Sequence, residues 1–176
     1  MATWTIDPAH SEVQFKIRHL VISTVSGSFK KFEGTVWSDR DDFTDAKIQF
    51  TAEADSVFTN NEQRDAHLKS DDFFNAEKFP KITFVSTEVI KEGKDEYILK
   101  GDLTMRDVTK PIRLDVDYGG TTVDSYGQTK AGFEITGKVD RQDYGLKWSA
   151  VTEAGGIVVS DDVRLIMSIQ IVKQPS

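Results

Sequence analysis

Alternation between apolar and polar residues is the main pattern along this chain. In residues 11–19 the side chains of Val13, Phe15 and Ile17 alternate with charged or polar ones. A period of two is typical of a β-strand that buries one face and exposes the other. The same pattern recurs along the sequence and predicts eight strands, in residues 11–19, 30–38, 47–55, 80–89, 97–106, 111–118, 130–140 and 162–173.

The connections between these segments indicate how the strands pair. Turn-forming Gly, Asp and Ser residues are concentrated in residues 39–45, 91–96, 118–128 and 153–162. Short turns join antiparallel neighbours, and no long helical pattern separates the strands as parallel pairing would require. The sequence therefore predicts an all-β fold with antiparallel strands.

A closed barrel fits the predicted strands better than a sandwich. Antiparallel strands in an open sheet leave two unpaired edges, and closure removes both. The last predicted strand, residues 162–173, would extend for roughly 40 Å at about 3.3 Å per residue, which is longer than most sandwich strands. We therefore expect one domain, residues 1–176, built as an elongated eight-stranded antiparallel β-barrel.

The pattern alone leaves open whether this barrel is filled. An eight-stranded barrel either packs its interior with side chains or holds one small ligand. Small residues at inward positions, such as Gly101, Ala131 and Gly137, indicate free space, because a packed core more often carries Leu, Ile or Val there. However, glycine in a strand also marks a bend of the wall.

Composition excludes several classes of function. The 176 residues carry a net charge of −7, which repels nucleic-acid backbones, and they contain no cysteine. Disulfides, thiolate metal sites and cysteine nucleophiles are therefore excluded. The first residues lack a basic start followed by an apolar run, so we expect a cytoplasmic protein, exported only if a leader has been removed.

Residues 64–80 break the alternation and have the spacing of a short helix. Leu68, Phe73 and Phe74 are the apolar positions on one edge of this segment. Pro80 ends it and begins the next strand. We expect a short helical segment that covers one end of the barrel with these three side chains turned inward. The alternative is a permanent plug that belongs to the ordinary core.

Recognisable residues lie in four blocks along the chain. They are Asp7, His10, Ser11, Gly27 and Phe29 in the first, Asp65, His67, Leu68, Phe73 and Pro80 in the second, Gly101, Leu103, Thr109 and Pro111 in the third, and Arg141, Asp143, Tyr144 and Gly145 in the fourth. In this order they resemble the YceI-like, or polyisoprenoid-binding, family, and the resemblance covers essentially the whole chain. Asp107 departs from it, because a small residue is expected there, and we expect this change to affect a turn rather than the interior.

The resemblance implies a lipocalin-like barrel with an apolar tunnel, a long isoprenoid or similar amphiphilic lipid as ligand, and a homodimer. We therefore expect non-enzymatic binding, storage or transport of such a lipid, without a cofactor. The residues expected to line the tunnel are Phe15, Ile17, His19, Phe50, Leu68, Phe73, Phe84, Leu103, Leu114, Phe133, Leu165 and Met167. The candidates for contact with the polar head group are His19, Arg64, His67 and Arg141.

Two alternative functions remain. A hydrolase would use His10 or His67, and Asp7, His10 and Ser11 contain the residue types of a nucleophilic triad. Proximity in sequence is not that geometry, and the sequence contains no Gly-x-Ser-x-Gly motif, so we favour a turn into the first long strand. Asp65 and His67 are two residues apart and would not face each other on a helix. The other alternative is a structural or interaction barrel without a cavity.

The sequence does not favour a metal site. A three-histidine site would need every histidine of the chain, yet His10 and His19 are nine residues apart and would face opposite sides of one strand. Residues 39–45 begin like a calcium loop, but Thr44 and Phe50 stand where the glycine and the closing glutamate are required. We interpret this segment as a solvated hairpin.

Overall fold

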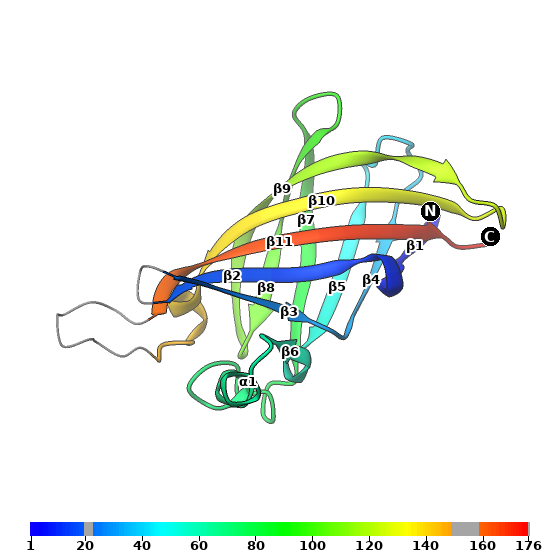
Figure 1. Cartoon of the computed structure of the whole chain (residues 1–176). Coiled ribbons are helices and arrows are strands. Elements are labelled where there is room, and N and C mark those ends of the chain that lie inside the picture. The colour runs from blue at the N-terminus through cyan, green and yellow to red at the C-terminus, as the bar shows by residue number, and fades with distance from the viewer. Residues whose placement is uncertain (20–22, 149–158, 176) are drawn as a thin grey trace.

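Antiparallel β-strands build almost the whole molecule (Figure 1). The computed structural model describes residues 1–19, 23–148 and 159–175. These residues form one α-helix, α1 Glu62–Lys69, and three short 3-10 helices, η1 Pro8–His10, η2 Ala54–Ser56 and η3 Arg141–Tyr144. The same residues form eleven strands, which are β1 Thr3–Ile6, β2 Glu12–His19, β3 Ser23–Phe29, β4 Phe32–Trp37, β5 Lys47–Glu53, β6 Val57–Phe58, β7 Lys81–Lys91, β8 Glu96–Met105, β9 Val108–Val123, β10 Thr129–Asp140 and β11 Val159–Lys173.

Eight of these strands close into a ring in the order β1, β4, β5, β7, β8, β9, β10 and β11. The ring closes because β1 pairs with β4 on one side and with β11 on the other, where Trp4 lies opposite Lys173. All pairings in the ring are antiparallel. The predicted eight-stranded antiparallel barrel is confirmed.

The strand that closes the ring is not the one that we expected. The predicted strand in residues 11–19 corresponds to β2, which lies outside the ring, and β1 takes its place. A bend separates the two strands, because the Asp7 side chain accepts a hydrogen bond from the Ala9 amide and Pro8 begins η1. As a result, β1 and β2 follow each other along the same side of β11.

Beyond this bend the sheet divides. β2 pairs with β3, and β3 pairs with the two residues of β6, so these strands extend from β11 as a flap beside the ring. Alternation did not predict β1, β3 or β6. β1 and β6 span four and two residues, which is too short to show a period, and β3 is rich in serine, which is typical of turns.

Two of the predicted turns are shorter in the structure. β9 continues to Val123, so only residues 124–128 connect it to β10. The Gly119-Gly120 pair, which we expected in the turn, lies instead at an irregularity of register where Tyr118 and Gly120 face successive residues of β10. In the predicted turn at 153–162, residues 159–162 belong to β11, and residues 153–158 lie outside the described part of the chain.

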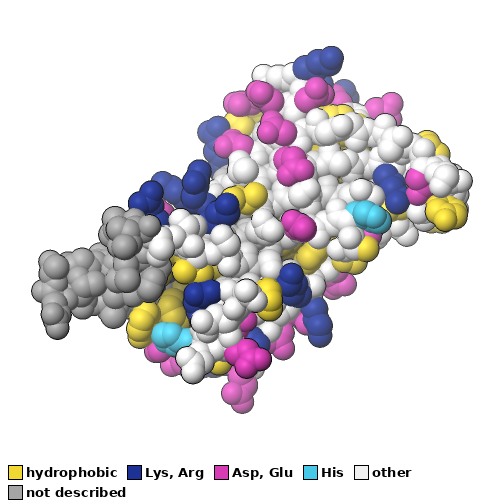
Figure 2. All heavy atoms as spheres, in the orientation of Figure 1, with side chains coloured by type: hydrophobic (Ala, Val, Ile, Leu, Met, Phe, Trp, Pro, Cys, Tyr) yellow, Lys and Arg dark blue, Asp and Glu magenta, His cyan; other side chains and the backbone are white. Residues whose placement is uncertain are grey.

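The two ends of the barrel differ (Figure 1). Both chain termini lie at one end, because β1 pairs with the last residues of β11, and we call it the closed end. The other end carries α1 and the turns that follow it, and we call it the lid end. We call residues 61–79 the lid. Between the ends, acidic and basic side chains both occur on the outer face, as the surface view shows (Figure 2).

Candidate ligand-binding cavity

The ring, together with β2 and β3 beside it, encloses a cavity with a volume of about 620 Å³. Small-molecule sites span about 300–1,000 Å³, whereas a close-packed interior leaves few voids larger than a water molecule. The interior is therefore hollow, and the alternative of a barrel without a cavity is wrong. The cavity touches residues of both ends, from Phe43 at the closed end to Asn61 and His67 at the lid end.

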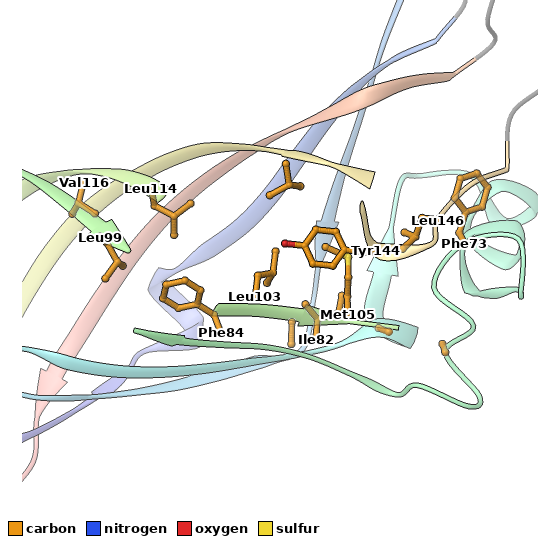
Figure 3. Packing of buried hydrophobic residues seen from close by; sticks show 14 of the residues in the cluster. Phe73, Ile82, Phe84, Leu99, Leu103, Met105, Leu114, Val116, Tyr144 and Leu146 are labelled. Atoms are coloured by element: carbon orange, nitrogen blue, oxygen red, sulfur yellow. The ribbon is translucent and has the colours of Figure 1, made fainter. Parts of the chain in front are cut away.

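The wall of this cavity is apolar almost throughout. Side chains from neighbouring strands, including Phe84, Leu103 and Leu114, point toward the same interior (Figure 3). The side chain of His19 lies outside what the structure describes, so its predicted contact is not placed. The other residues that we expected in the lining all border the cavity, and they are Phe15, Ile17, Phe50, Leu68, Phe73, Phe84, Leu103, Leu114, Phe133, Leu165 and Met167.

The glycines of the wall do not create this space. A Cβ added at Gly101 would overlap the ring of Phe84, and one added at Gly137 would overlap Leu114. These glycines therefore give the large neighbouring side chains room to lie against the backbone. The interpretation of Gly101 and Gly137 as free volume is wrong, because the residue on the adjacent strand already occupies it.

Aromatic side chains form the floor of the cavity at the closed end. Phe43 packs edge-on against Trp4 and Phe133, with ring centroids 5.3 and 5.4 Å apart, and its centroid lies 5.9 Å from that of Tyr118. Phe43 is only 6% exposed, although it lies in the acidic stretch 39–45 that we interpreted as a solvated hairpin. That interpretation is wrong for Phe43, because a positive φ of 59° turns the side chain into the barrel.

Side-chain hydrogen bonds hold this loop, residues 38–46, which we call the plug loop. The Asp45 carboxylate accepts hydrogen bonds from the Ser38 hydroxyl at 2.6 Å and the Asp39 amide at 2.8 Å. Asp42 accepts one from the Thr44 hydroxyl at 2.7 Å. Hydrogen bonds from Thr44 and then from Arg40 lower the pKa of Asp42 from 3.8 to about 2. A hydrogen bond from Ser38 lowers the pKa of Asp45.

The lid begins with α1, which β6 and the residues after it hold in place. Asn61 caps the helix by accepting a hydrogen bond from the Arg64 amide at 2.9 Å. Asp65 accepts hydrogen bonds from the amide and hydroxyl of the buried Thr59, and Arg64 donates to the carbonyl of Thr59 at 2.5 Å. Asp65 therefore serves the helix and is not a partner of His67, as the spacing predicted.

The helix ends at Lys69, so it is shorter than the predicted segment 64–80. Residues 70–79 form turns, because Ser70 bonds back to the His67 carbonyl and later amides bond to residues 68–75. Phe73 is buried and Phe74 half-buried, both against the core, which agrees with a cover and equally with a permanent plug. Arg106 fastens these turns by donating to the carbonyls of Asp71 and Phe73 and to the Asp71 carboxylate at 2.6 Å.

His67 lies at the rim of the cavity among aromatic rings. Its Nε2 is 2.8 Å from the Asp72 carboxylate, and its ring packs edge-on against Phe73 and Trp148, with centroids 5.1 and 4.7 Å apart. Arg64, the second expected head-group residue, borders the cavity beside it. Asp72 and Trp148 were not predicted as partners of His67, because they contact it from outside the helix.

Arg141 also borders the cavity, but the N–H groups of its guanidinium donate to backbone carbonyls of the protein. The side chain is 3% exposed and donates to the carbonyls of Leu146, Trp148, Val159 and Ser160 at 2.6–3.3 Å. Burial lowers the pKa of Arg141, and the nearby carboxylates of Asp161 and Asp140 oppose this shift. Arg141 therefore joins η3 to the start of β11, and its role toward a head group stays a prediction.

Asp7, His10 and Ser11 do not form a triad. His10 Nδ1 lies 2.8 Å from the Asp7 carboxylate, which is the contact that a histidine base makes with the acid that orients it. Ser11, however, accepts a hydrogen bond from the Gln170 amide at 2.9 Å, so its hydroxyl is engaged with β11. These residues form the bend between β1 and β2, which agrees with the structural interpretation.

One polar atom in the core has no partner among the described residues. The Tyr144 hydroxyl is buried there without a hydrogen bond, and it points toward Leu103 in the close-up view (Figure 3). Burial, followed by the charge of Asp143, raises the pKa of Tyr144 to about 12. The hydroxyl therefore stays protonated and could donate a hydrogen bond to a ligand or water oxygen.

In the described part of the chain, no three acidic or histidine side chains lie close enough together to hold a metal ion. None of the helices found there is long and apolar enough to span a bilayer.

Known proteins share this fold and much of this sequence. A family model described as the YceI-like domain matches residues 4–171. A UPF0312 protein of Staphylococcus aureus strain MSSA476 is 39% identical over 165 residues, which cover 93% of this chain and 94% of that protein. The crystal structure of a Campylobacter jejuni YCEI protein is 34% identical, with 92% of this chain and 91% of that chain covered and a TM-score of 0.75.

A more distant structure extends the likeness of fold. A polyisoprenoid binding domain from Saccharophagus degradans, implicated in plant cell wall breakdown, is similar over 98% of both chains with a TM-score of 0.72. Its sequence identity is 14%, so this likeness concerns the fold alone.

Proposed function

The chain belongs to the YceI-like domain family, and on this premise we propose that it binds and carries a long-chain isoprenoid or a similar amphiphilic lipid without chemically changing it. The observation that carries the proposal is the apolar cavity of about 620 Å³, which reaches from the aromatic floor to the lid. A linear apolar chain matches this shape and wall chemistry. The Saccharophagus degradans domain is described as binding polyisoprenoids, which is consistent with this ligand class.

Burial of the chain supplies ample free energy of binding. Each buried CH₂ contributes about 0.8 kcal/mol, so a five-carbon unit contributes roughly 3–4 kcal/mol. Several such units approach the practical ceiling of about 20 kcal/mol, and the costs of ordering the chain must offset part of that sum. Release from the wall alone would be slow. The lid supplies a route, because it is held by hydrogen bonds from Thr59 to the Asp65 carboxylate and from Arg106 to the Phe73 carbonyl, and such segments open locally.

We place the polar head group of the lipid at the lid end. Arg64 and His67 border the cavity there. The guanidinium of Arg64 is a cation and the imidazole of His67 can form hydrogen bonds, so together they suit a phosphate or hydroxyl head group. Asp72 orients the His67 ring by its contact at Nε2. Arg141 is the weaker candidate, since its donors already bond to four carbonyls.

The contacts of the histidines support a carrier over a hydrolase. The side-chain partners of His67 in the described chain are Asp72, Phe73 and Trp148, none of which carries a hydroxyl or thiol. His10 contacts Asp7 while Ser11 bonds to β11. Neither histidine therefore has a hydroxyl nucleophile in place.

Native mass spectrometry followed by solvent extraction of the purified protein tests the proposal. We expect a discrete lipid at one molecule per chain, or uptake of added prenyl lipid at that ratio. A bare chain that also refuses added prenyl alcohols and prenyl phosphates contradicts it.

Matched histidine variants test the head-group site and the hydrolase alternative together. His67→Ala should weaken binding of a prenyl phosphate by about tenfold, and His10→Ala, which changes a residue away from the cavity, should leave binding unchanged. Loss of a measurable lipid turnover in either variant, with binding intact, would favour the hydrolase. Homodimerisation, implied by the family resemblance, stays a prediction that light scattering on the loaded protein checks.

A further inference from the structure

The barrel wall is incomplete between β5 and β7. Their hydrogen-bonded pairing begins with Glu53 opposite Lys81 and ends with Gln49 opposite Val85. β7 then continues to Lys91, with an irregularity of register between Ser86 and Glu88. Toward the closed end, therefore, no residue of the described β5 pairs with residues 86–91. We call this stretch the seam.

A side-chain hydrogen bond crosses the seam where the ladder would continue. The Ile48 amide donates to the Ser86 hydroxyl at 2.8 Å instead of to a backbone carbonyl. A side-chain acceptor can rotate away without breaking the sheet, whereas a ladder bond cannot. The seam is therefore a part of the wall that no backbone ladder joins among the described residues.

A groove of about 470 Å³ lies on the outer side of the seam. Its lining is mixed, because the charged residues Asp45, Lys47 and Glu88 lie beside the apolar residues Trp37 and Val85. Val85 is 46% exposed, which is unusual for a large apolar residue in this chain. The apolar part of the groove is therefore a surface on which the end of a chain can lie beside water.

The groove and the cavity are separated by shared side chains. Ala46, Ile48, Gln49 and Val89 border both spaces, and Ile48 and Val89 are the large apolar side chains of this partition. Neither is fully buried, and they come from the two strands that do not pair there. Directly along the barrel axis, by contrast, Phe43 and its aromatic neighbours block the closed end.

We propose that the seam is a side portal through which the far end of a long ligand leaves the cavity and lies in the outer groove. This inference rests on the proposed lipid binding and specifies its ligand class as linear chains that can exceed the length of the cavity. The head group stays at the lid end, the chain follows the barrel, and its terminus passes between Ile48 and Val89. The portal makes binding tolerant of added length, which a blind-ended cavity would not be.

A series of prenyl alcohols of increasing length, farnesol, geranylgeraniol and solanesol, tests the portal. We expect the native chain to bind solanesol at least as tightly as geranylgeraniol. Val85→Trp fills the groove outside the portal and should weaken solanesol binding by about tenfold or more. It should change geranylgeraniol binding by less than about twofold, because Val85 borders the groove but not the cavity. Ile135→Trp is the matched control, because Ile135 borders the cavity but not the groove. The Ile135→Trp variant should weaken the binding of both alcohols by a similar factor.

A double-cysteine variant tests the portal without relying on one bulky side chain. Lys47 and Thr87 border the groove from the two strands, and the chain contains no cysteine, so Lys47→Cys with Thr87→Cys introduces the only thiols. A short reducible bis-thiol linker between them should slow solanesol uptake, and its reduction should restore the native rate.

The outcomes separate this inference from the proposed function. If the native chain binds geranylgeraniol but rejects solanesol, or if Val85→Trp and the linker leave solanesol binding at the native level, the portal is wrong and the carrier proposal stands. If Val85→Trp weakens the binding of both alcohols as Ile135→Trp does, the portal is also wrong. If the native chain binds no prenyl alcohol, the proposed function itself fails.

Discussion

The two ends of this barrel are closed by different kinds of contact. At the closed end, β1 bonds to both of its neighbours through the backbone, and the plug loop inserts Phe43 into an aromatic cluster. At the lid end, the contacts of α1 and the turns after it with the barrel include side-chain hydrogen bonds from Thr59 and Arg106. Backbone ladders open only when the domain unfolds. The lid also has aromatic contacts, such as that of Phe73 with Trp148, but among the described residues no strand pairing joins it to the ring, so it can open locally. On the proposed function, we therefore expect a ligand to enter at the lid.

Truncating one phenylalanine at each end provides the strongest test of this difference. Phe43→Ala should lower the free energy of unfolding by about 3–5 kcal/mol, because it empties the centre of the aromatic floor. Phe73→Ala should lower it by only about 1–2 kcal/mol, because the lid opens without unfolding the ring. Urea denaturation measures both values. Equal losses, or a larger loss for Phe73→Ala, would contradict the comparison.

Weakening the contacts of the lid alone should raise its rate of amide hydrogen exchange more than it lowers the free energy of unfolding of the protein. Arg106→Met removes the bonds to Asp71 and Phe73 while keeping much of the apolar stem, and we expect a loss of about 1 kcal/mol. Hydrogen exchange in residues 70–79 should accelerate while exchange in β8 stays slow. Arg113→Met is the control, because that side chain pairs with Asp115 on the outer wall. Unchanged exchange in the lid would show that Arg106 does not hold it.

Acid should weaken the closed end through the plug loop. The pKa of Asp42 is lowered to about 2 and that of Asp45 is also lowered, so the folded state favours both carboxylates. Their contribution is present above about pH 4 and is lost as the pH falls toward about 2. Asp42→Asn should flatten this part of the curve of stability against pH. Amide exchange that rises first in the lid rather than in residues 38–46 would contradict this order.

The smallest expected effect concerns the turn between β8 and β9. Arg106 and Asp107 have φ values of 50° and 62°, a conformation that glycine adopts without strain. Asp107→Gly should therefore stabilise the protein by about 0.5–1 kcal/mol. Asp107→Ala, which lacks the local hydrogen bonding of aspartate, should destabilise it. Thermal unfolding measures both. The position of Asp107 in this turn agrees with the expectation that its departure from the family does not concern the interior.

Alternation predicted the barrel because a period of two reports which face of a strand is buried. Phe15, Leu103 and Met167 border the cavity as their positions indicated. The same signal could not predict β1, since four residues carry too few repeats and its role depends on pairing with residues at the other end of the chain. Ring closure is thus a tertiary property that local pattern does not contain.

The site was only partly predictable for a similar reason. Arg64 and His67 lie at the cavity rim, in a segment that already departed from strand alternation. Phe43 was missed because it lies among acids, which are typical of solvent-exposed loops, and only its positive φ turns it inward. The sequence did not decide whether the barrel interior is filled or hollow. Packing between strands determines whether an inward-facing glycine leaves free space or is covered by a neighbouring side chain.

The pairing of β1 with β11 also has a consequence for how the protein is made. One of the two partners of β1 lies far along the chain, since Trp4 lies opposite Lys173. Contacts between such distant residues form slowly, and a nascent chain that has not reached β11 lacks them altogether. Until β11 has been made, the apolar inner surface and the free edges of β1 and β10 stay open to wrong partners. Biogenesis of this barrel therefore favours conditions, or chaperones, that protect an almost complete chain.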